Sequence, residues 1–341
     1  MPRVGFFDSS VFDSHDAGAG HPERPERLQA VRRGLREAGL VDELVQVAPR
    51  PATREELLRV HGAELVEAVA ATQGRQVSFD ADTAAGPRSY EAALLAVGAA
   101  VEAVERVRAG GLDRAFCAVR PPGHHATRHT AMGFCLFNNV AVAAAAALEG
   151  GLERVAILDF DVHHGNGTQD IFWDEPRVLF VSSHQVPLYP GTGSLAESGG
   201  PRARGLTVNL PMPPGCGDAE YAAVWRQVVL PIARAFAPQL VLVSCGFDAH
   251  RGDPLAGMDL TDAGYAALAD VCLEAAAPAK GRVVMLLEGG YDLDNIAGAT
   301  RAVVGCLLDR RAATTIGGPS PEGERLAAAF RAAHSRFWPL E

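Results

Sequence analysis

The stretch VAILDFDVHHGNG, residues 155–167, decides the fold that this sequence predicts. Its apolar residues are typical of a strand buried inside a parallel sheet, which we expect at residues 155–162. Side chains alternate along a strand, so Asp159, Asp161 and His163 would project to one side if the chain stays extended. Two carboxylates and one imidazole at the end of a buried strand favour a metal site over a solvated turn.

Composition narrows the class of protein. The chain has 341 residues, and 48% of them are hydrophobic, which is enough for a large core. One domain over residues 1–341 is the simplest interpretation of this length. Its net charge of −10 argues against direct nucleic-acid binding. The six cysteines are scattered, no signal peptide is apparent and no apolar run reaches about 18 residues. We therefore expect a cytoplasmic protein with no membrane contact.

Strands alternate with helices in the predicted order of elements, after a mainly helical first third. Apolar runs predict strands at residues 4–7, 115–119, 155–162, 178–182, 205–210, 240–245 and 282–287. Helical spacing predicts helices at residues 25–38, 55–71, 89–109, 137–148, 221–236, 261–276, 295–308 and 322–337, with Thr261 as an N-cap. This order predicts an α/β fold in which a parallel sheet has helices on both faces.

Polar clusters follow four of these strands. They are GHH at 123–125, DFDVHHG at 159–165, GFDAH at 246–250 and EGGYD at 288–292. In open parallel sheets, ligand sites gather at the carboxyl ends of the strands. We therefore expect the four segments to form one active site at that edge of the sheet.

Three residues of these clusters suit a metal ion. Asp161 and His163 are close in sequence, and Asp248 arrives from another strand. Such a ligand set leaves room for water, which a bound cation makes more acidic, and a bound carbonyl becomes more electrophilic. Zinc is the first expectation, and iron or cobalt also suits nitrogen and oxygen ligands.

The tandem histidines, His124 and His125, are candidates for the general base and general acid, because the pKa of imidazole lies near neutral pH. Asp159 and Asn166 are the available partners that would fix their tautomers. The hydroxyl of Tyr291, which follows two glycines, could hydrogen-bond to an oxyanion. Together with a metal, these groups predict hydrolysis of an amide or an ester.

Seven motifs carry a family resemblance. They are HPERPERL (21–28), RPPGHHA (120–126), GFCLFNN (133–139), DFDVHHGNGTQ (159–169), YPGTG (189–193), GFDAHRGDPLAG (246–257) and LEGGYD (287–292). Together they resemble the histone deacetylase superfamily, which includes acetylpolyamine deacetylases and acetoin-utilisation proteins, and the resemblance is strongest over residues 4–308. It implies the arginase–deacetylase fold, a single domain whose eight-stranded parallel sheet has helices on both sides.

The resemblance also implies a role for each matching residue. The ligands of one zinc ion would be Asp161, His163 and Asp248. The catalytic residues would be His125 as general base and acid, supported by Asn166, His124 paired with Asp159, and Tyr291 as the residue that polarises the acetyl carbonyl. A narrow acyl-lysine tunnel would be lined by Gly133, Phe134, Tyr189 and Leu255, with Asp82 holding the substrate backbone. A structural potassium ion would lie among Asp159, Asp161, His163, Ser182 and Ser183.

Details of the motifs refine these expectations. Asn166 stands where class I enzymes of the family have Asp, which is the class II pattern, and a neutral amide should leave His125 with a lower pKa. Leu255 replaces the Glu of a eukaryotic polyamine-selective branch, which weakens a polyamine reading. We also expect the loop of His21 and Glu23 to shape the tunnel mouth.

The sequence thus predicts a zinc-dependent amidohydrolase that removes acetyl groups from acetyl-lysine or a similar acetylated amine, with homo-oligomerisation left open. One alternative is an acetylpolyamine or other small-molecule deacetylase, since family membership gives the reaction and not the acyl carrier. A second alternative, of another class, is a non-catalytic protein that binds an acylated ligand. A binuclear manganese ureohydrolase would need further carboxylate ligands in place of His124 and His125.

Overall fold

The strand that begins at Val155 lies inside a large sheet. In the computed structural model, which describes residues 1–310 and 319–340, β6 (Val155–Asp159) pairs with β9 (Leu240–Cys245) on one side and β7 (Val178–Gln185) on the other. The strand order is β2-β1-β5-β10-β9-β6-β7-β8, and all neighbours are parallel. The other strands are β1 (Val4–Phe7), β2 (Val45–Val47), β5 (Arg114–Cys117), β8 (Thr207–Met212) and β10 (Val283–Leu287). The predicted eight-stranded parallel sheet is therefore confirmed.

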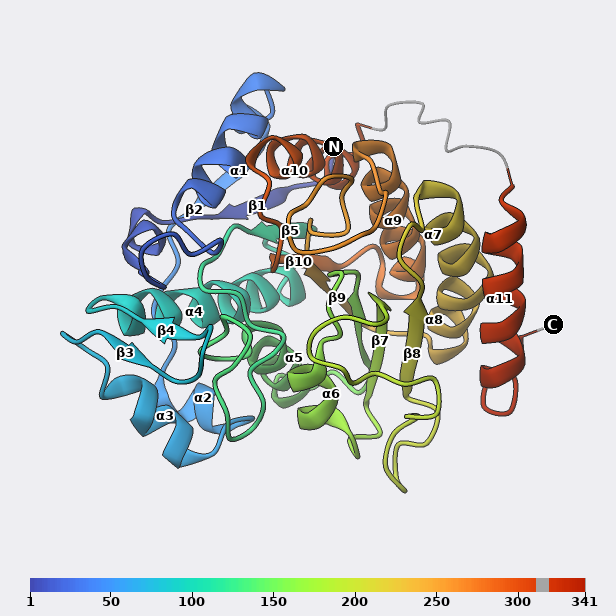
Figure 1. The fold of residues 1–341 in the computed structure, drawn as a ribbon, viewed down its shortest axis with the longest axis horizontal. Helices are drawn as coiled ribbons and strands as arrows, with labels where there is room; N and C mark the ends of the chain where they lie inside the picture. Colours follow the sequence, from blue (N-terminus) through green and yellow to red (C-terminus); the bar gives the residue numbers. More distant parts are fainter. Residues whose placement is uncertain (311–318, 341) are drawn as a thin grey trace.

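Helices cover both faces of this sheet (Figure 1). On one face α4 (Ser89–Arg108) contacts β1, β5 and β10, and α5 (Asn139–Glu149) contacts β6 and β9. On the other face α9 (Asp262–Ala275) contacts β9, α10 (Leu293–Leu307) contacts β5, and α1 (Glu26–Glu37) packs on α10. Every residue of β6, β9 and β10 is buried, as expected of a parallel strand covered on both faces.

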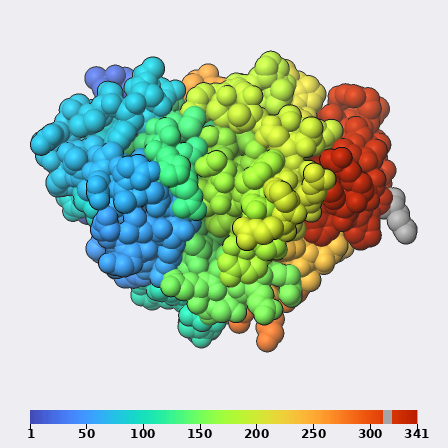
Figure 2. Space-filling model, turned by 90° about the horizontal axis from the view of Figure 1, so that it is seen from below, coloured from blue at the N-terminus to red at the C-terminus, as the bar shows by residue number. Residues whose placement is uncertain are grey.

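Shorter elements complete the fold. The segments α7 (Asp218–Val224), the π-helical turn η3 (Trp225–Val229) and α8 (Leu230–Phe236) form one continuous helix. The last helix, α11 (Pro321–His334), packs on α7 and lies at one end of the molecule (red in Figure 2). The remaining helices are α2 (Arg54–Leu58), α3 (Ala63–Ala70) and α6 (Asn166–Phe172), with 3₁₀ turns η1 (Ser10–Ser14), η2 (Val41–Glu43) and η4 (Ala277–Ala279). A small antiparallel pair is formed by β3 (Val77–Ser78) and β4 (Ala84–Ala85).

The structure shortens one predicted strand, divides one predicted helix and contains an edge strand that was not predicted. The strand expected to reach residue 162 ends at Asp159, so the site residues after it lie on a loop. The helix expected over 55–71 is two helices, and Gly62, whose N–H donates to the backbone of Arg128, starts the second. The edge strand β2 was not predicted, because it has three residues and two of them are exposed. None of the helices in residues 1–310 and 319–340 is both long and apolar enough to span a membrane.

Candidate active site

Four strands of the sheet deliver polar residues to one place. The loops that follow β5, β6, β9 and β10 carry His124 and His125, Asp161 and His163, Asp248, and Tyr291, respectively. These strands are neighbours in the order β5-β10-β9-β6, so their carboxyl ends lie side by side. The clusters that are separated in sequence therefore meet at one edge of the sheet, where ligand sites of such folds lie.

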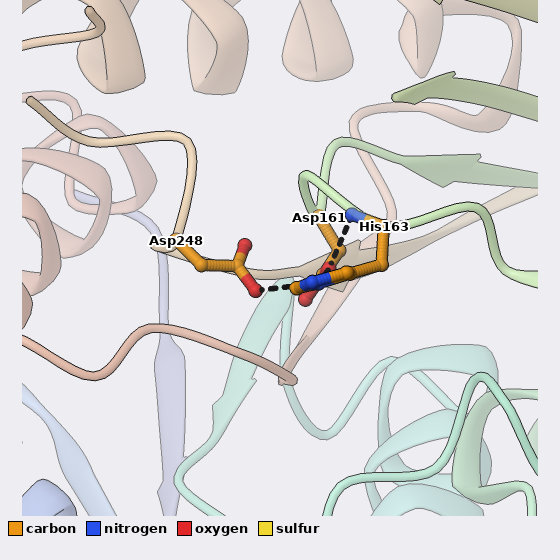
Figure 3. Close-up of side chains that lie close together, drawn as sticks. All are labelled: Asp161, His163 and Asp248. Atoms are coloured by element: carbon orange, nitrogen blue, oxygen red, sulfur yellow. Dashed lines mark hydrogen bonds and ion pairs between the residues drawn. The ribbon is translucent and has the colours of Figure 1, made fainter. Parts of the chain in front are cut away.

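Asp161, His163 and Asp248 form a compact set of possible metal ligands (Figure 3). One ligand atom from each lies within 4.8 Å of the others, and it is the only such group among the residues that the structure describes. The His163 Nδ1 atom is 3.1 Å from Asp161 Oδ1 and 3.1 Å from Asp248 Oδ2. Backbone N–H groups hold the far oxygens of the two carboxylates, from Gly289 to Asp161 at 2.8 Å and from Val162 to Asp248 at 3.0 Å. These N–H bonds fix the orientation of the two carboxylates beside His163.

The charges of this set suit a divalent cation. Burial opposes the charged form of His163, but hydrogen bonds to Asp161 and Asp248 outweigh burial and raise its pKa to about 10. Two buried carboxylates therefore require a positive charge between them, which a proton on His163 or a metal ion can supply. One nitrogen and two carboxylate ligands match a catalytic centre that keeps coordination positions open.

Glycines leave the space that the carboxylates fill. A Cβ added to Gly246 would lie 2.1 Å from Asp161 Oδ2, and one added to Gly289 would lie 2.0 Å from Asp248 Oδ2. No real Cβ approaches an oxygen so closely, so any other residue at these positions would displace a ligand. The glycines of the GFDAH and EGGYD motifs thus have a steric reason to be there.

The two tandem histidines hold different charges. His124 Nδ1 lies 3.0 Å from Asp159 Oδ2. Burial disfavours its charged form, but the carboxylates of Asp161 and Asp159 raise the pKa of His124 to about 10. Burial raises the pKa of Asp159 to about 6, even though His124 opposes this. The pair is therefore an imidazolium and a carboxylate at neutral pH.

His125 is held as a neutral base. Its Nδ1 atom lies 2.7 Å from Asn166 Oδ1, and because a carbonyl oxygen only accepts, Nδ1 carries the proton and Nε2 has a free lone pair. Burial, and then the positive charges of His124 and His163, hold the pKa of His125 well below its ordinary value. A neutral imidazole with an open Nε2 can take a proton from a water molecule.

Tyr291 lies in aromatic and cationic surroundings. Its ring contacts Phe134 edge-on at 5.8 Å between centroids, and the guanidinium carbon of Arg27 lies 5.0 Å from the ring centroid. Burial raises the pKa of Tyr291 well above 10, although Arg27 opposes this. The hydroxyl therefore keeps its proton and can donate a hydrogen bond.

These groups surround a cavity of about 220 Å³. It is lined by Asp82, Pro122, His124, His125, Gly133, Phe134, His163, Leu188, Tyr189, Leu255, Gly289 and Tyr291. The Tyr189 ring stands edge-on to His125 at 5.1 Å between centroids. A Cβ on Gly133 would lie 2.4 Å from His125 Cδ2, so the glycine lets the wall approach the histidine closely. The cavity brings together Asp82 and four of the five residues expected in the tunnel.

His21, the fifth expected tunnel residue, lies beside the cavity and not on its wall. Its ring contacts Phe134 at 4.5 Å between centroids, and its Nε2 atom is 3.1 Å from the backbone oxygen of Asp82. Of the loop expected to shape the mouth, Glu23 is only 1% exposed, so its side chain lies in the interior and not at the mouth. Glu23 forms ion pairs with Arg27 at 3.0 Å and Arg120 at 2.5 Å, which hold it in the interior.

Two of the expected potassium residues, Asp161 and His163, also belong to the set of possible metal ligands, and the other three lie in β6 and β7. Ser182 and Ser183 are fully buried in β7, and Ser182 is paired with Asp159 in the sheet. Their hydroxyls already have partners, His184 Nδ1 for Ser182 at 3.0 Å and Trp225 Nε1 for Ser183 at 3.1 Å. Within residues 1–310 and 319–340, no group donates a hydrogen bond to the backbone oxygens of Asp161 or His163. Such oxygens suit a hard monovalent cation.

Three buried charged residues near the site were not predicted. Arg27 donates to the backbone oxygens of Gly290, at 2.6 Å, and Glu288. The side chain of Glu288 accepts N–H bonds from Gly123 at 2.6 Å and His124 at 3.2 Å. Asp253 accepts N–H bonds from the loop of Tyr291. All three residues lie in the motifs that carry the family resemblance. Their contacts with loops remote in sequence show which parts of the site they support.

Comparison with known proteins places these features in a family context. The family model described as the histone deacetylase domain matches residues 21–307. A probable deacetylase of Archaeoglobus fulgidus is 41% identical over 288 residues, which are 82% of this chain and 79% of that protein. A histone deacetylase-like amidohydrolase of Pseudomonas aeruginosa is 44% identical over 279 residues, 81% of this chain and 73% of that protein.

A longer plant relative and a solved structure match the same family. Histone deacetylase 15 of Arabidopsis thaliana is 43% identical over 314 residues, which cover 89% of this chain and 54% of that protein, so the chain spans about half its length. The crystal structure of the HDA15 HD domain superposes with a TM-score of 0.92 at 39% identity and covers 99% of this chain and 96% of that one.

Proposed function

Since this chain belongs to the histone deacetylase family, we propose that it is a zinc-dependent deacetylase that hydrolyses the amide of acetyl-lysine or a similar acetylated amine. The observation that carries the proposal is the convergence of the Asp161, His163 and Asp248 set with neutral His125 and protonated Tyr291 around one cavity. A metal site, a base and a hydrogen-bond donor around one pocket are the parts that amide hydrolysis needs.

Zinc fits the ligand set better than a hard cation does, because an imidazole nitrogen is among the ligands. When bound there, a divalent cation would make water more acidic and the acyl carbonyl more electrophilic. A structural potassium ion beside Asp159 and Ser182 is a further part of the proposal. It is supported by the backbone oxygens of Asp161 and His163, to which no N–H group of the described residues donates a hydrogen bond.

The residues of the chain would act in the following order. His125 accepts at Nε2 a proton from the water that attacks the acyl carbon, while its Nδ1–H stays bonded to Asn166. The Tyr291 hydroxyl donates a hydrogen bond to the carbonyl oxygen as negative charge develops on it. His125 then gives the proton to the leaving amine, and the His124–Asp159 pair stabilises the charge nearby.

The cavity would admit a slender acylated chain. Phe134, Tyr189 and Leu255 are apolar or aromatic and suit the methylene groups of a lysine side chain. Asp82, at the same cavity, would accept a hydrogen bond from the substrate backbone or attract a second amine.

Parallel assays of three substrates test this proposal. We would compare turnover of an acetyl-lysine peptide, acetylputrescine and acetylspermidine by zinc-loaded protein, with a chelated sample and the variant His125→Ala as controls. We expect turnover of the peptide that is lost on chelation and in the variant. A preference for the two polyamines would move the function to a small-molecule deacetylase. Failure to hydrolyse any of them with zinc bound would contradict acetyl hydrolysis and favour a protein that only binds acylated ligands.

A further inference from the structure

A single buried carboxylate holds two walls of the cavity. Asp253 lies in the loop between β9 and α9 and is 5% exposed. Its Oδ1 atom accepts the N–H of Leu255 at 3.0 Å. Its Oδ2 atom accepts the N–H of Tyr291 at 2.7 Å and the N–H of Asp292 at 3.3 Å. Both Leu255 and Tyr291 line the cavity.

The backbone that carries Tyr291 needs such an anchor. Gly289 and Gly290 precede it, and Gly290 has a φ of 112°, so this segment has the conformational freedom of glycine. The segment ends at Asp292, which caps α10. Contacts from other loops hold the backbone of the two glycines, and Asp253 holds the N–H groups of Tyr291 and Asp292 that follow them. Loss of the bonds to Asp253 would let the hydroxyl move relative to His125 and the metal ligands.

Stability alone does not account for a carboxylate at this position. No basic side chain of the described residues forms an ion pair with Asp253, and burial, together with the nearby carboxylate of Asp248, raises the pKa of Asp253 to about 7. An unpaired buried charge is costly unless hydrogen bonds satisfy it. Three N–H groups donate hydrogen bonds to the Asp253 carboxylate and stabilise it, and all three belong to the segments that carry Leu255 and Tyr291.

We propose that Asp253 is a positioning residue: it holds the hydroxyl of Tyr291 at the reacting carbonyl and fixes the Leu255 wall at the same time. The inference rests on the proposed function, because Tyr291 must act on the substrate for its position to matter. Asp253 itself would touch neither the substrate nor the metal. Through its two oxygens it links Leu255, on the wall of the cavity, to Tyr291, at the reacting carbonyl.

A double-mutant cycle tests the proposal. The variant Asp253→Ala should lose about 10²-fold in kcat, because displacements near 1 Å cost that much in an active site. In a Tyr291→Phe background the same change should alter kcat by no more than about twofold, because the group it positions is gone. Equal losses in both backgrounds would overturn the proposal. Asp253→Asn, which keeps one accepting oxygen, should recover part of kcat.

Asp218→Ala is the matched control for general loosening. Asp218 accepts the backbone N–H of Thr261 at 2.8 Å and its hydroxyl at 2.6 Å, so it is a similar carboxylate tie outside the cavity. We expect Asp218→Ala to lower the melting temperature while kcat stays near that of the wild type. A matching loss of kcat in Asp218→Ala would show that loosening alone explains the effect.

Hydrogen exchange separates this inference from the proposed function. With the zinc-loaded protein, Asp253→Ala should speed deuterium uptake in the segment 288–292 and at Leu255, and Asp218→Ala should not. This readout needs no substrate, so it applies even to a protein that hydrolyses no acetyl amide. Unchanged uptake in 288–292 would contradict the positioning role, whereas lack of turnover by the wild type would contradict only the proposed function.

Discussion

His125 Nδ1 lies 2.7 Å from the amide oxygen of Asn166, whereas the neighbouring His124 Nδ1 lies 3.0 Å from a carboxylate oxygen of Asp159. The two imidazoles are adjacent in sequence, and their ring centroids are 4.0 Å apart. One partner is neutral and the other is charged, so the pair divides into a neutral base and a fixed cation. Because His125 is the neutral member of the pair, it is the histidine that can accept a proton.

Asn166→Asp should move the pH dependence of the reaction. A carboxylate at the Asn166 position would favour the imidazolium form and so raise the pKa of His125 from its low value. Since His125 must be neutral to accept a proton, activity is lost as the pH falls through this pKa. The acid limb of kcat/KM should therefore lie at higher pH in Asn166→Asp than in the wild type. An acid limb at the same pH in both proteins would assign it to another group.

Tyr291→Phe should separate chemistry from folding. The phenylalanine ring keeps the contacts with Phe134 and Arg27, and only the hydroxyl is lost. We expect kcat to fall by about 10²- to 10³-fold, the usual effect of removing one oxyanion donor, while KM and the melting temperature change little. Steady-state kinetics with an acetyl-lysine peptide and a thermal melt give both quantities. Near-normal kcat would remove Tyr291 from the reaction.

Gly246→Ala should weaken metal binding through steric displacement. The added Cβ would lie 2.1 Å from Asp161 Oδ2 and would force this carboxylate to move. We expect zinc affinity to fall by about 10- to 100-fold, as for other changes around metal ligands, in a titration against a chelator. Gly111→Ala is the control, since its Cβ would lie 3.4 Å from Arg106 O in ordinary contact. Equal zinc affinity of the two variants would argue against Asp161 as a ligand.

Glu23→Gln should destabilise the fold. Burial alone would raise the pKa of Glu23, but Arg120 and His15 outweigh burial and hold this pKa well below 4.5. The variant leaves the buried guanidinium groups of Arg27 and Arg120 without their carboxylate, which should cost about 3 to 5 kcal/mol of unfolding free energy at pH 7.

The same group gives the wild type a pH-dependent stability. Because the folded pKa of Glu23 is depressed, its contribution is complete above the ordinary value of 4.5 and is lost as the pH falls below it toward the folded pKa. Urea unfolding at several pH values should show this dependence in the wild type and a weaker one in Glu23→Gln. Asp294→Asn, which breaks an exposed pair with Arg33, should cost less than about 1 kcal/mol. Similar costs for the two variants would contradict the assigned role of the buried cluster.

The sequence predicted the core of the sheet because its strands are continuous apolar runs that end in polar clusters. It predicted the meeting of Asp161 and His163 for the wrong reason, since the strand stops at Asp159. The residues converge because the loop folds on its own carboxylates: the N–H of Asp161 donates to Asp159 Oδ1, and the N–H of His163 donates to Asp161 Oδ1. Such local bonds depend on the turn and not on alternation along a strand.

Hydrophobic periodicity could not predict the short edge strand or the long-range contacts around the site. The edge strand β2 pairs directly with β1, with Gly5 opposite Val45, although the two strands are far apart in sequence. A run of three residues, two of them exposed, is too short for periodicity to predict a strand. The roles of Arg27 and Asp253 depend on contacts with the loop at residues 288–292, which is remote from both in sequence. A sequence pattern marks the motifs in which these residues lie, but only the folded chain shows which loops each one holds.

Release of acetate from an acetyl-lysine peptide, before and after removal of the metal, tests the central claim most directly. We predict multiple turnovers by the zinc-loaded wild type, none after chelation, and recovery when zinc is added back, with no recovery in Asp248→Asn. Turnover that persists in the chelated protein, with its metal content measured as absent, would contradict the account of Asp161, His163 and Asp248 as the ligands of a catalytic metal.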